Sequence, residues 1–106
     1  MTRYKLVFFV PSTHVTPVKR VIFSTGAGTI GLYKHCAFQT PGQGSFMPVD
    51  GANPAIGEVG KEETGEEFRV EVQCDGEQQT REAVSEMKKA HPYEEVAYDV
   101  YRMEDF

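Results

Sequence analysis

The chain has 106 residues, of which 40% are hydrophobic and 25% charged, with a formal net charge of −5. This length and composition suit one folded domain with a modest core, and they exclude a disordered chain. The acidic balance and the absence of a Lys/Arg block argue against nucleic-acid binding and anionic membrane surfaces, and no apolar run approaches the roughly 20 residues of a membrane span.

The N-terminal quarter predicts a strand followed by a helix. Residues 4–10 are β-branched and aromatic and end at Pro11, which is typical of a strand. This strand is apolar on both faces, which favours a central position with both faces covered. Residues 13–25 carry valine and isoleucine at helical spacing, with serine or threonine available as N-cap and Gly26 as the C-terminal stop.

Residues 26–31 match the pattern G-x-G-x-x-G. The dinucleotide fingerprint needs a strand before it and a helix after it, whereas here a helix precedes and a strand pattern follows. We therefore interpret the glycines as a helix stop and a tight connector that uses left-handed conformations. Residues 32–40 predict a strand whose period of two makes His35 and Cys36 point to opposite faces.

Residues 41–65 differ in composition from the rest of the chain. They contain six glycines and three prolines around two short apolar segments, at 46–47 and 55–56. An excursion of this length in a small domain is usually functional or contains small hairpins. We expect an ordered loop or a short hairpin, with an extended piece near residues 45–49.

The C-terminal part predicts a strand, a helix and a last strand. Residues 66–74 alternate between apolar and polar, residues 78–90 form an amphipathic helical pattern, and residues 96–102 predict the last strand. Between helix and strand lies the connector His91-Pro92-Tyr93-Glu94-Glu95, which Pro92 stiffens. One interpretation of this connector is a solvated turn, and the other is a binding or assembly site.

The predicted order is strand–helix–strand, an excursion, then strand–helix–strand. This order predicts an α+β fold of the ferredoxin-like, split βαβ type, with an antiparallel sheet and two helices on one face. We expect one domain over residues 1–106, with 41–65 as its excursion. The doubly apolar first strand predicts that the other sheet face is covered by the excursion or by a second copy of the chain, and hence a homo-oligomer.

Five segments also carry a family resemblance, namely residues 26–36, 42–48, 52–57, 67–71 and 91–95. In this order they resemble the domain inserted in the middle of GTP cyclohydrolase I type 2-like proteins, the Nif-three-like or YqfO family. The His-Pro-Tyr-Glu element is similar to one in the CutA divalent-cation-tolerance family. Both resemblances imply a ferredoxin-like fold of the CutA/PII kind, often trimeric. The family usually has proline where this chain has Val96.

The resemblance does not extend to the family's hydrolase chemistry. In full-length members a pair of metal ions is held by the two flanking halves, whereas this chain resembles only the insert. A metal site within the insert would use His35, Cys36 and His91, because imidazole and thiolate suit copper or zinc. Cys36 and Cys74 could also approach each other on neighbouring strands. No C-x-x-C or H-x-x-x-H spacing supports such a site.

Catalysis has weaker support than binding. Cys36 with His91 matches no known nucleophile signature, and Glu94 and Glu95, as neighbours on an extended segment, would point apart. A small-molecule or anion site could instead use backbone amides of the glycine-rich segments.

We therefore predict a cytoplasmic, oligomeric module for binding, sensing or assembly, with a trimer favoured by the resemblance and no export signal expected. Its ligand site would comprise His91, Tyr93, Glu94, Glu95, Gly42 and Gly44. The alternative is a small divalent-metal-binding protein of the CutA copper-tolerance type.

Overall fold

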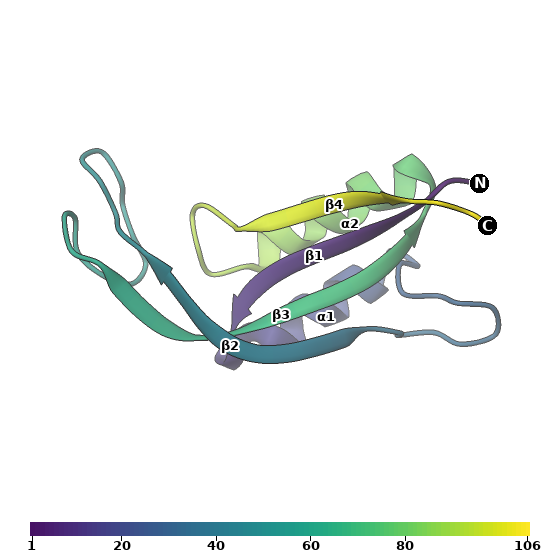
Figure 1. Ribbon diagram of the computed structural model, residues 1–106, viewed down its shortest axis with the longest axis horizontal. Helices are drawn as coiled ribbons and strands as arrows, with labels where there is room; N and C mark the ends of the chain where they lie inside the picture. Colours follow the sequence, from purple (N-terminus) through teal and green to yellow (C-terminus); the bar gives the residue numbers. More distant parts are fainter.

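A four-stranded antiparallel sheet carries two helices on one face (Figure 1). The computed structural model describes all 106 residues. The elements are β1 (Arg3–Pro11), the 3₁₀ turn η1 (Ser12–His14), α1 (Val15–Phe23), β2 (Phe38–Phe46), β3 (Glu63–Asp75), α2 (Gly76–Ala90) and β4 (Tyr98–Met103). The strands lie in the order β2-β3-β1-β4, each antiparallel to its neighbours. This is the α+β architecture that the order of elements predicts.

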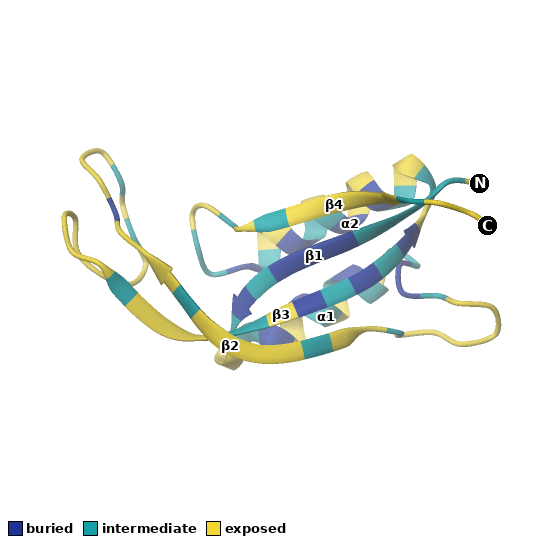
Figure 2. Ribbon diagram, viewed as in Figure 1, coloured by how far each residue is buried: buried dark blue, intermediate teal, exposed yellow.

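The core lies between the sheet and the helices. Leu6 and Phe8 of β1 pair with Val72 and Val70 of β3, and all four are fully buried. Burying each such side chain contributes about 1.5–3 kcal/mol, so the β1–β3 pair forms the sheet side of the core. The buried cluster comprises Leu6, Phe8, Val10, Val15, Val18, Ile22, Ala27, Val70, Val72, Cys74, Ala83 and Met87. Figure 2 shows it as the dark band along β1, β3 and the helices.

The two helices follow their predicted ranges, with α1 shorter by two residues at each end and α2 longer by two residues at its start. α1 begins at Val15, after η1, and no side chain caps its start, so the predicted serine or threonine cap is wrong. Gly26 follows the helix with φ 91°, as a glycine stop requires. α2 ends at Ala90, because Pro92 forces His91 into extended geometry with ψ 139°.

The second strand differs from its prediction. Residues 32–37 form a loop in which His35 has φ 59°, and β2 begins only at Phe38 and continues to Phe46. β3 serves as the template, pairing from Phe38↔Glu71 to Phe46↔Glu63. Pro41 is compatible with this pairing because β2 is an edge strand whose outer side needs no donor.

The glycine motif at 26–31 is structural, as predicted. Gly26, Gly28 and Gly31 all have positive φ. The amide of Gly28 donates to the Gln73 carbonyl oxygen at 2.8 Å, and the Cys36 amide donates to the Gly28 carbonyl oxygen at 2.8 Å. The first bond attaches the loop to the end of β3, and the second closes the loop on itself.

The excursion at 41–65 is a hairpin. β2 and β3 extend past the helices and curve away from the sheet as an arm, which we define as residues 42–66 with its tip at 47–62 (Figure 1). The molecule consequently measures 46 × 24 × 22 Å, with a radius of gyration of 14.7 Å. A compact chain of this length would have a radius of gyration of about 13 Å. Most of the arm is exposed (Figure 2).

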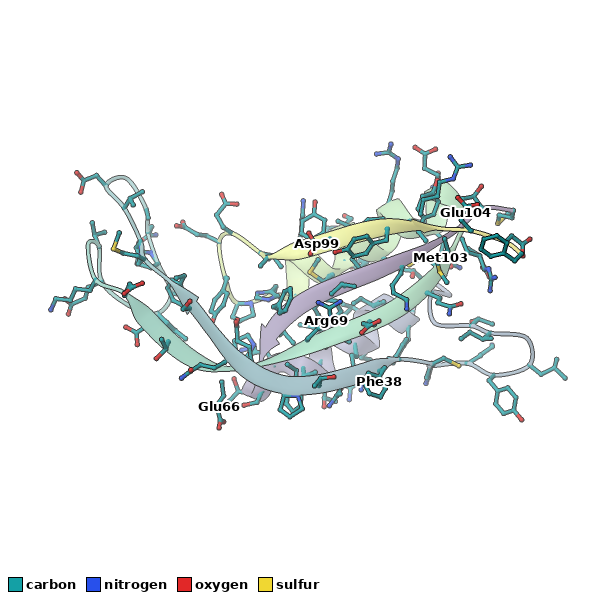
Figure 3. The ribbon with its side chains drawn as sticks, in the orientation of Figure 1. Phe38, Glu66, Arg69, Asp99, Met103 and Glu104 are labelled. Atoms are coloured by element: carbon teal, nitrogen blue, oxygen red, sulfur yellow. The ribbon has the colours of Figure 1, made fainter.

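The sheet face opposite the helices, which we call the open face, has no second layer. Figure 3 shows Phe38, Arg69 and Asp99 on three of its strands. Val7 is fully buried there, and the Arg69 guanidinium lies over the Phe9 ring, 5.9 Å from its centroid. Phe38 nevertheless stays 67% exposed. The prediction that β1 is apolar on both faces is confirmed, and charged side chains cover only part of this face.

Candidate functional site

A cavity of about 340 Å³ lies between the arm and the connector that joins α2 to β4. This volume is within the range of about 300–1,000 Å³ of small-molecule sites. Fifteen residues line it, nine of them hydrophobic: Phe9, Ser45, Phe46, Met47, Pro48, Val49, Ala52, Pro54, Ala55, Ile56, Glu67, Tyr93, Glu94, Glu95 and Ala97. The fold thus brings three of the predicted ligand residues, Tyr93, Glu94 and Glu95, against the glycine- and proline-rich excursion.

His91 fixes the connector and does not line the cavity. Its Nε2 lies 2.7 Å from the Phe9 carbonyl oxygen, and the Tyr93 amide donates to its Nδ1 at 3.1 Å. The neutral ring with its proton on Nε2 satisfies both bonds. Burial lowers the pKa of His91 and thereby favours this neutral form, although the bond to Phe9 acts in the opposite direction.

Tyr93 joins the connector to the arm. Its ring lies 6.0 Å from the Phe46 ring, centroid to centroid, in a tilted arrangement, and 5.1 Å from the His91 ring. Burial raises the pKa of Tyr93, and the negative charge of Glu67 raises it further. The phenol is therefore neutral, with a hydroxyl able to donate or accept a hydrogen bond.

Glu94 and Glu95 have different surroundings. The Asn53 amide at the arm tip donates to Glu94 Oε1 at 2.9 Å, so Glu94 closes the cavity by linking the connector to the arm. Glu95 lines the cavity without a hydrogen bond or ion pair. The expectation that the two residues point apart assumed an extended segment, but residues 92–95 form a bend and both contribute to the cavity.

Glu67 is the functional candidate that sequence reasoning missed. The alternation along β3 predicted that Glu67 points away from the core. It does, and on that side the arm forms the cavity that Glu67 lines. Its side chain lies across Gly44, where a Cβ would overlap the carboxylate. Burial raises the pKa of Glu67, and no salt bridge in the structure involves it. The signal that could have identified it is the pair of apolar segments in the excursion, which must pack over neighbouring residues of β3.

The predicted roles of the two glycines change in the structure. Gly42 and Gly44 belong to β2 and pair with Glu67 and Gly65 of β3, so they form strand backbone rather than a concave loop of free amides. Gly42 does not line the cavity, and a Cβ there would meet nothing within 4 Å. Gly44 matters because it leaves room for Glu67.

The fold does not bring His35, Cys36 and His91 together. His35 stacks on Phe23, with ring centroids 4.8 Å apart, and Cys36 lies in the loop before β2. No group of three or more His, Cys, Asp or Glu side chains is placed to hold a metal ion. The residues of one chain therefore do not fit copper or zinc, and metal binding stays an untested prediction.

Cys74 lies in the core, whereas Cys36 is half-buried in the loop before β2. Cys74 is fully buried, and burial raises the pKa of its thiol to about 11. Both cysteines are free thiols. Neither helix is long and apolar enough to cross a lipid bilayer.

Comparison with known proteins connects this geometry to a family. No protein-family model matches the chain. A GTP cyclohydrolase 1 type 2 homolog from Halalkalibacterium halodurans is 47% identical over 98 residues, which cover 92% of this chain and 26% of that protein. The homolog from Bacillus subtilis is 46% identical over 100 residues, covering 94% of this chain and 26% of that protein. The chain thus spans about a quarter of the curated relatives that it matches.

Solved structures agree with this assignment. A Bacillus cereus protein related to NIF3 superposes with a TM-score of 0.84 at 40% identity, over 98% of this chain and 26% of that chain. The periplasmic divalent cation tolerance protein CutA from Archaeoglobus fulgidus superposes with a TM-score of 0.69 at 19% identity, over 98% of this chain and 86% of that chain, and shows a shared fold. The chain therefore has a CutA-like fold and corresponds to about a quarter of the length of the GTP cyclohydrolase 1 type 2 homologs, the NIF3-related proteins, which it matches along nearly its whole length.

Proposed function

We propose that this chain is a homo-oligomeric module that binds a small molecule in the cavity between the arm and the connector, and that its role is binding or sensing rather than catalysis. The observation that carries the proposal is the cavity of about 340 Å³, where predicted site residues of the connector meet the arm. The relatives' name refers to a cyclohydrolase, and no residue of this chain supports transferring that activity.

The construction of the cavity supports a binding role. One wall is the connector, which His91 Nε2 fixes to the Phe9 carbonyl oxygen of β1 and which the bond from the Tyr93 amide to His91 Nδ1 holds in its own shape. The other wall is the arm, which has no helix behind it and contacts the connector through Phe46–Tyr93 and Asn53–Glu94. Because no second layer backs the arm, it would be able to move toward the fixed wall and close the cavity around a ligand.

The open face supports self-association. Phe38 is 67% exposed and Tyr101 is 52% exposed on this face, while Val7 and Phe9 lie between them. An exposed apolar area next to an unpaired edge strand is typical of a surface that another copy covers. We favour a trimer, as the likeness to CutA suggested from the sequence, and a cytoplasmic location in which both thiols stay reduced.

Native mass spectrometry of the protein purified without a tag or chelator tests both parts of the proposal. We expect a trimer that carries additional mass from a bound ligand. Phe38→Glu should dissociate the trimer, because it adds a charge to the open face. Thr16→Glu adds the same charge on the exposed side of α1 and should leave the mass unchanged.

The outcomes separate the two parts. A Phe38→Glu protein that keeps the wild-type mass would contradict assembly through the open face. A wild-type protein that stays monomeric and binds no small molecule in any screen would contradict the proposed function as a whole.

A further inference from the structure

We propose that the cavity between the arm and the connector selects small organic cations, in which an alkylammonium group is joined to an apolar body, and that Glu67 is the counter-ion. The inference rests on the proposed function, because it assigns a ligand class to the same cavity. It starts from the charges of the lining. Three carboxylates line the cavity, those of Glu67, Glu94 and Glu95, and no lysine, arginine or histidine does.

Glu67 is the carboxylate best placed to receive a cation. Glu94 already accepts a hydrogen bond from Asn53 at 2.9 Å. Glu95 and Glu67 both lack a hydrogen bond and a salt bridge, but Glu95 is exposed to water whereas Glu67 is half-buried. Arg69, two residues further along β3, is paired with Glu71 at 3.5 Å and lies over Phe9. A carboxylate that is partly removed from water without a partner is unfavourable, and a bound cation would compensate it. The upward shift of the pKa of Glu67 agrees with this missing compensation.

The position of Glu67 is specified by the neighbouring strand. Gly44 of β2 has no side chain, and the Glu67 carboxylate occupies the space that a Cβ would need. Gly42, two residues earlier on the same strand, faces open space. A side chain at position 44 would meet the Glu67 carboxylate, whereas one at position 42 would not. The absence of a side chain at Gly44 therefore allows Glu67 to lie against β2.

The remaining lining suits the organic part of such a ligand. Phe46 and Tyr93 form an aromatic corner with ring centroids 6.0 Å apart, and Phe9, over which the Arg69 guanidinium lies, adds apolar surface. Ammonium groups bind the faces of aromatic rings within about 6 Å of the centroid. Methionine, valine and isoleucine side chains of the arm tip complete an apolar wall.

Other ligand classes fit less well. A bare metal ion needs several converging oxygen, nitrogen or sulfur ligands, and no group of three or more such side chains is placed to hold one. An anion would meet three carboxylates and no cation. A neutral apolar molecule would leave Glu67 uncompensated.

Three probes of similar shape test the inference by calorimetric titration of the full chain: hexylammonium, hexanol and hexanoate. We expect hexylammonium to bind at least tenfold more tightly than hexanol, which is about 1.4 kcal/mol, and hexanoate not to bind. Glu67→Gln should weaken hexylammonium binding at least tenfold. Glu66→Gln removes the same charge one residue away, on the other face of β3, and should bind as the wild type does.

The glycine pair gives a second, independent comparison. Gly44→Ala should weaken hexylammonium binding as Glu67→Gln does, because the new methyl group displaces the carboxylate, and Gly42→Ala should not. Unfolding midpoints in urea verify that each variant is folded. Glu67→Gln should be at least as stable as the wild type, since it removes an uncompensated charge.

The results that would overturn the inference differ from those that would overturn the proposed function. Equal affinity for hexylammonium and hexanol, or unchanged hexylammonium affinity in Glu67→Gln, would refute selection of cations while leaving a binding cavity in place. A natural ligand that proves anionic would do the same. If a second copy fills the cavity in the assembled protein, so that no probe enters it, both the inference and the proposed ligand site fail.

Discussion

His91 allows a quantitative test of how the cavity is built. Its ring, 7% exposed, accepts a hydrogen bond from the Tyr93 amide and bonds the Phe9 carbonyl oxygen. His91→Ala would remove both partners at once and leave a carbonyl and an amide without their hydrogen bonds. The connector would then lose its side-chain bond to the end of β1, while the bond from the Phe9 amide to the Ala97 carbonyl oxygen, 3.1 Å long, would remain.

The size of the effect follows from these contacts. Each lost hydrogen bond contributes about 0.5–1.5 kcal/mol, and a buried group left without a partner loses about 1–3 kcal/mol. Together with the lost packing of the ring, we expect His91→Ala to lower the free energy of unfolding by about 2–4 kcal/mol. A domain of this length would show this as a fall in melting temperature of roughly 10–25 °C.

The dependence on pH distinguishes this account from a simple packing defect. Burial holds the pKa of folded His91 below its ordinary value of 6.5. The His91 ring therefore binds a proton more readily in the unfolded chain than in the folded one. Its contribution to the free energy of unfolding is complete above about pH 6.5. This contribution to stability declines as the pH falls below about 6.5 and through the lower pKa of His91 in the folded state. The difference in stability between wild type and His91→Ala should be largest near pH 8 and smaller near pH 5.

Urea unfolding at several pH values, followed by circular dichroism, measures these quantities. His14→Ala is the control for stability at pH 8, because the His14 ring bonds only its exposed neighbour Thr13, and we expect it to change stability there by less than about 0.5 kcal/mol. It does not serve as a control at low pH, because the charge of His14 contributes to lowering the pKa of His91. A loss below about 0.5 kcal/mol for His91→Ala, or a loss that does not vary between pH 5 and 8, would refute the reasoning.

Two further predictions concern the loop before β2 and the core thiol. Gly28 has φ 82°, and a Cβ there would lie 2.9 Å from the Phe23 ring, so Gly28→Ala should lower stability in urea by about 2 kcal/mol or more. Gly31→Ala, with φ 57° and nothing within 4 Å, should lose only about 1 kcal/mol, and equal losses would contradict the clash. Burial raises the pKa of the Cys74 thiol to about 11, so iodoacetamide at pH 8 should modify Cys36 and not Cys74. Mass spectrometry of the alkylated protein measures this. Alkylation of both thiols at the same rate would show that the core opens.

The sequence predicted those parts of the fold in which pattern and burial agree. β3 and α2 carry clear apolar periodicity, and β1 is a continuous apolar run that ends at a proline. The structure places all three within a few residues of their predicted ends. β2 was misplaced because its actual residues include Pro41 and two glycines, which disfavour strands. Pairing with the long β3 overrides this local preference.

The candidate site was predicted only in part for a similar reason. The density of functional groups in His91–Glu95 marked the connector, and Tyr93, Glu94 and Glu95 line the cavity. The partners of the connector come from the arm, and single-sequence patterns do not show how a hairpin bends. Glu67 looked like one of several solvent-facing charges on β3 until the arm placed it beside Tyr93.

The arm changes how local stability is distributed along a single strand. Val70 and Val72 lie over the core, whereas residues 63–66 of the same strand are backed only by β2. Amide hydrogens should therefore exchange slowly at one end of β3 and fast at the other, with opening of the arm requiring no disruption of the core. A ligand held between Tyr93 and the arm would slow exchange along the outer ladder, including at amides that it never touches. Ligand binding in the cavity would then reduce the local motion of distant parts of the arm without changing the shape of the sheet.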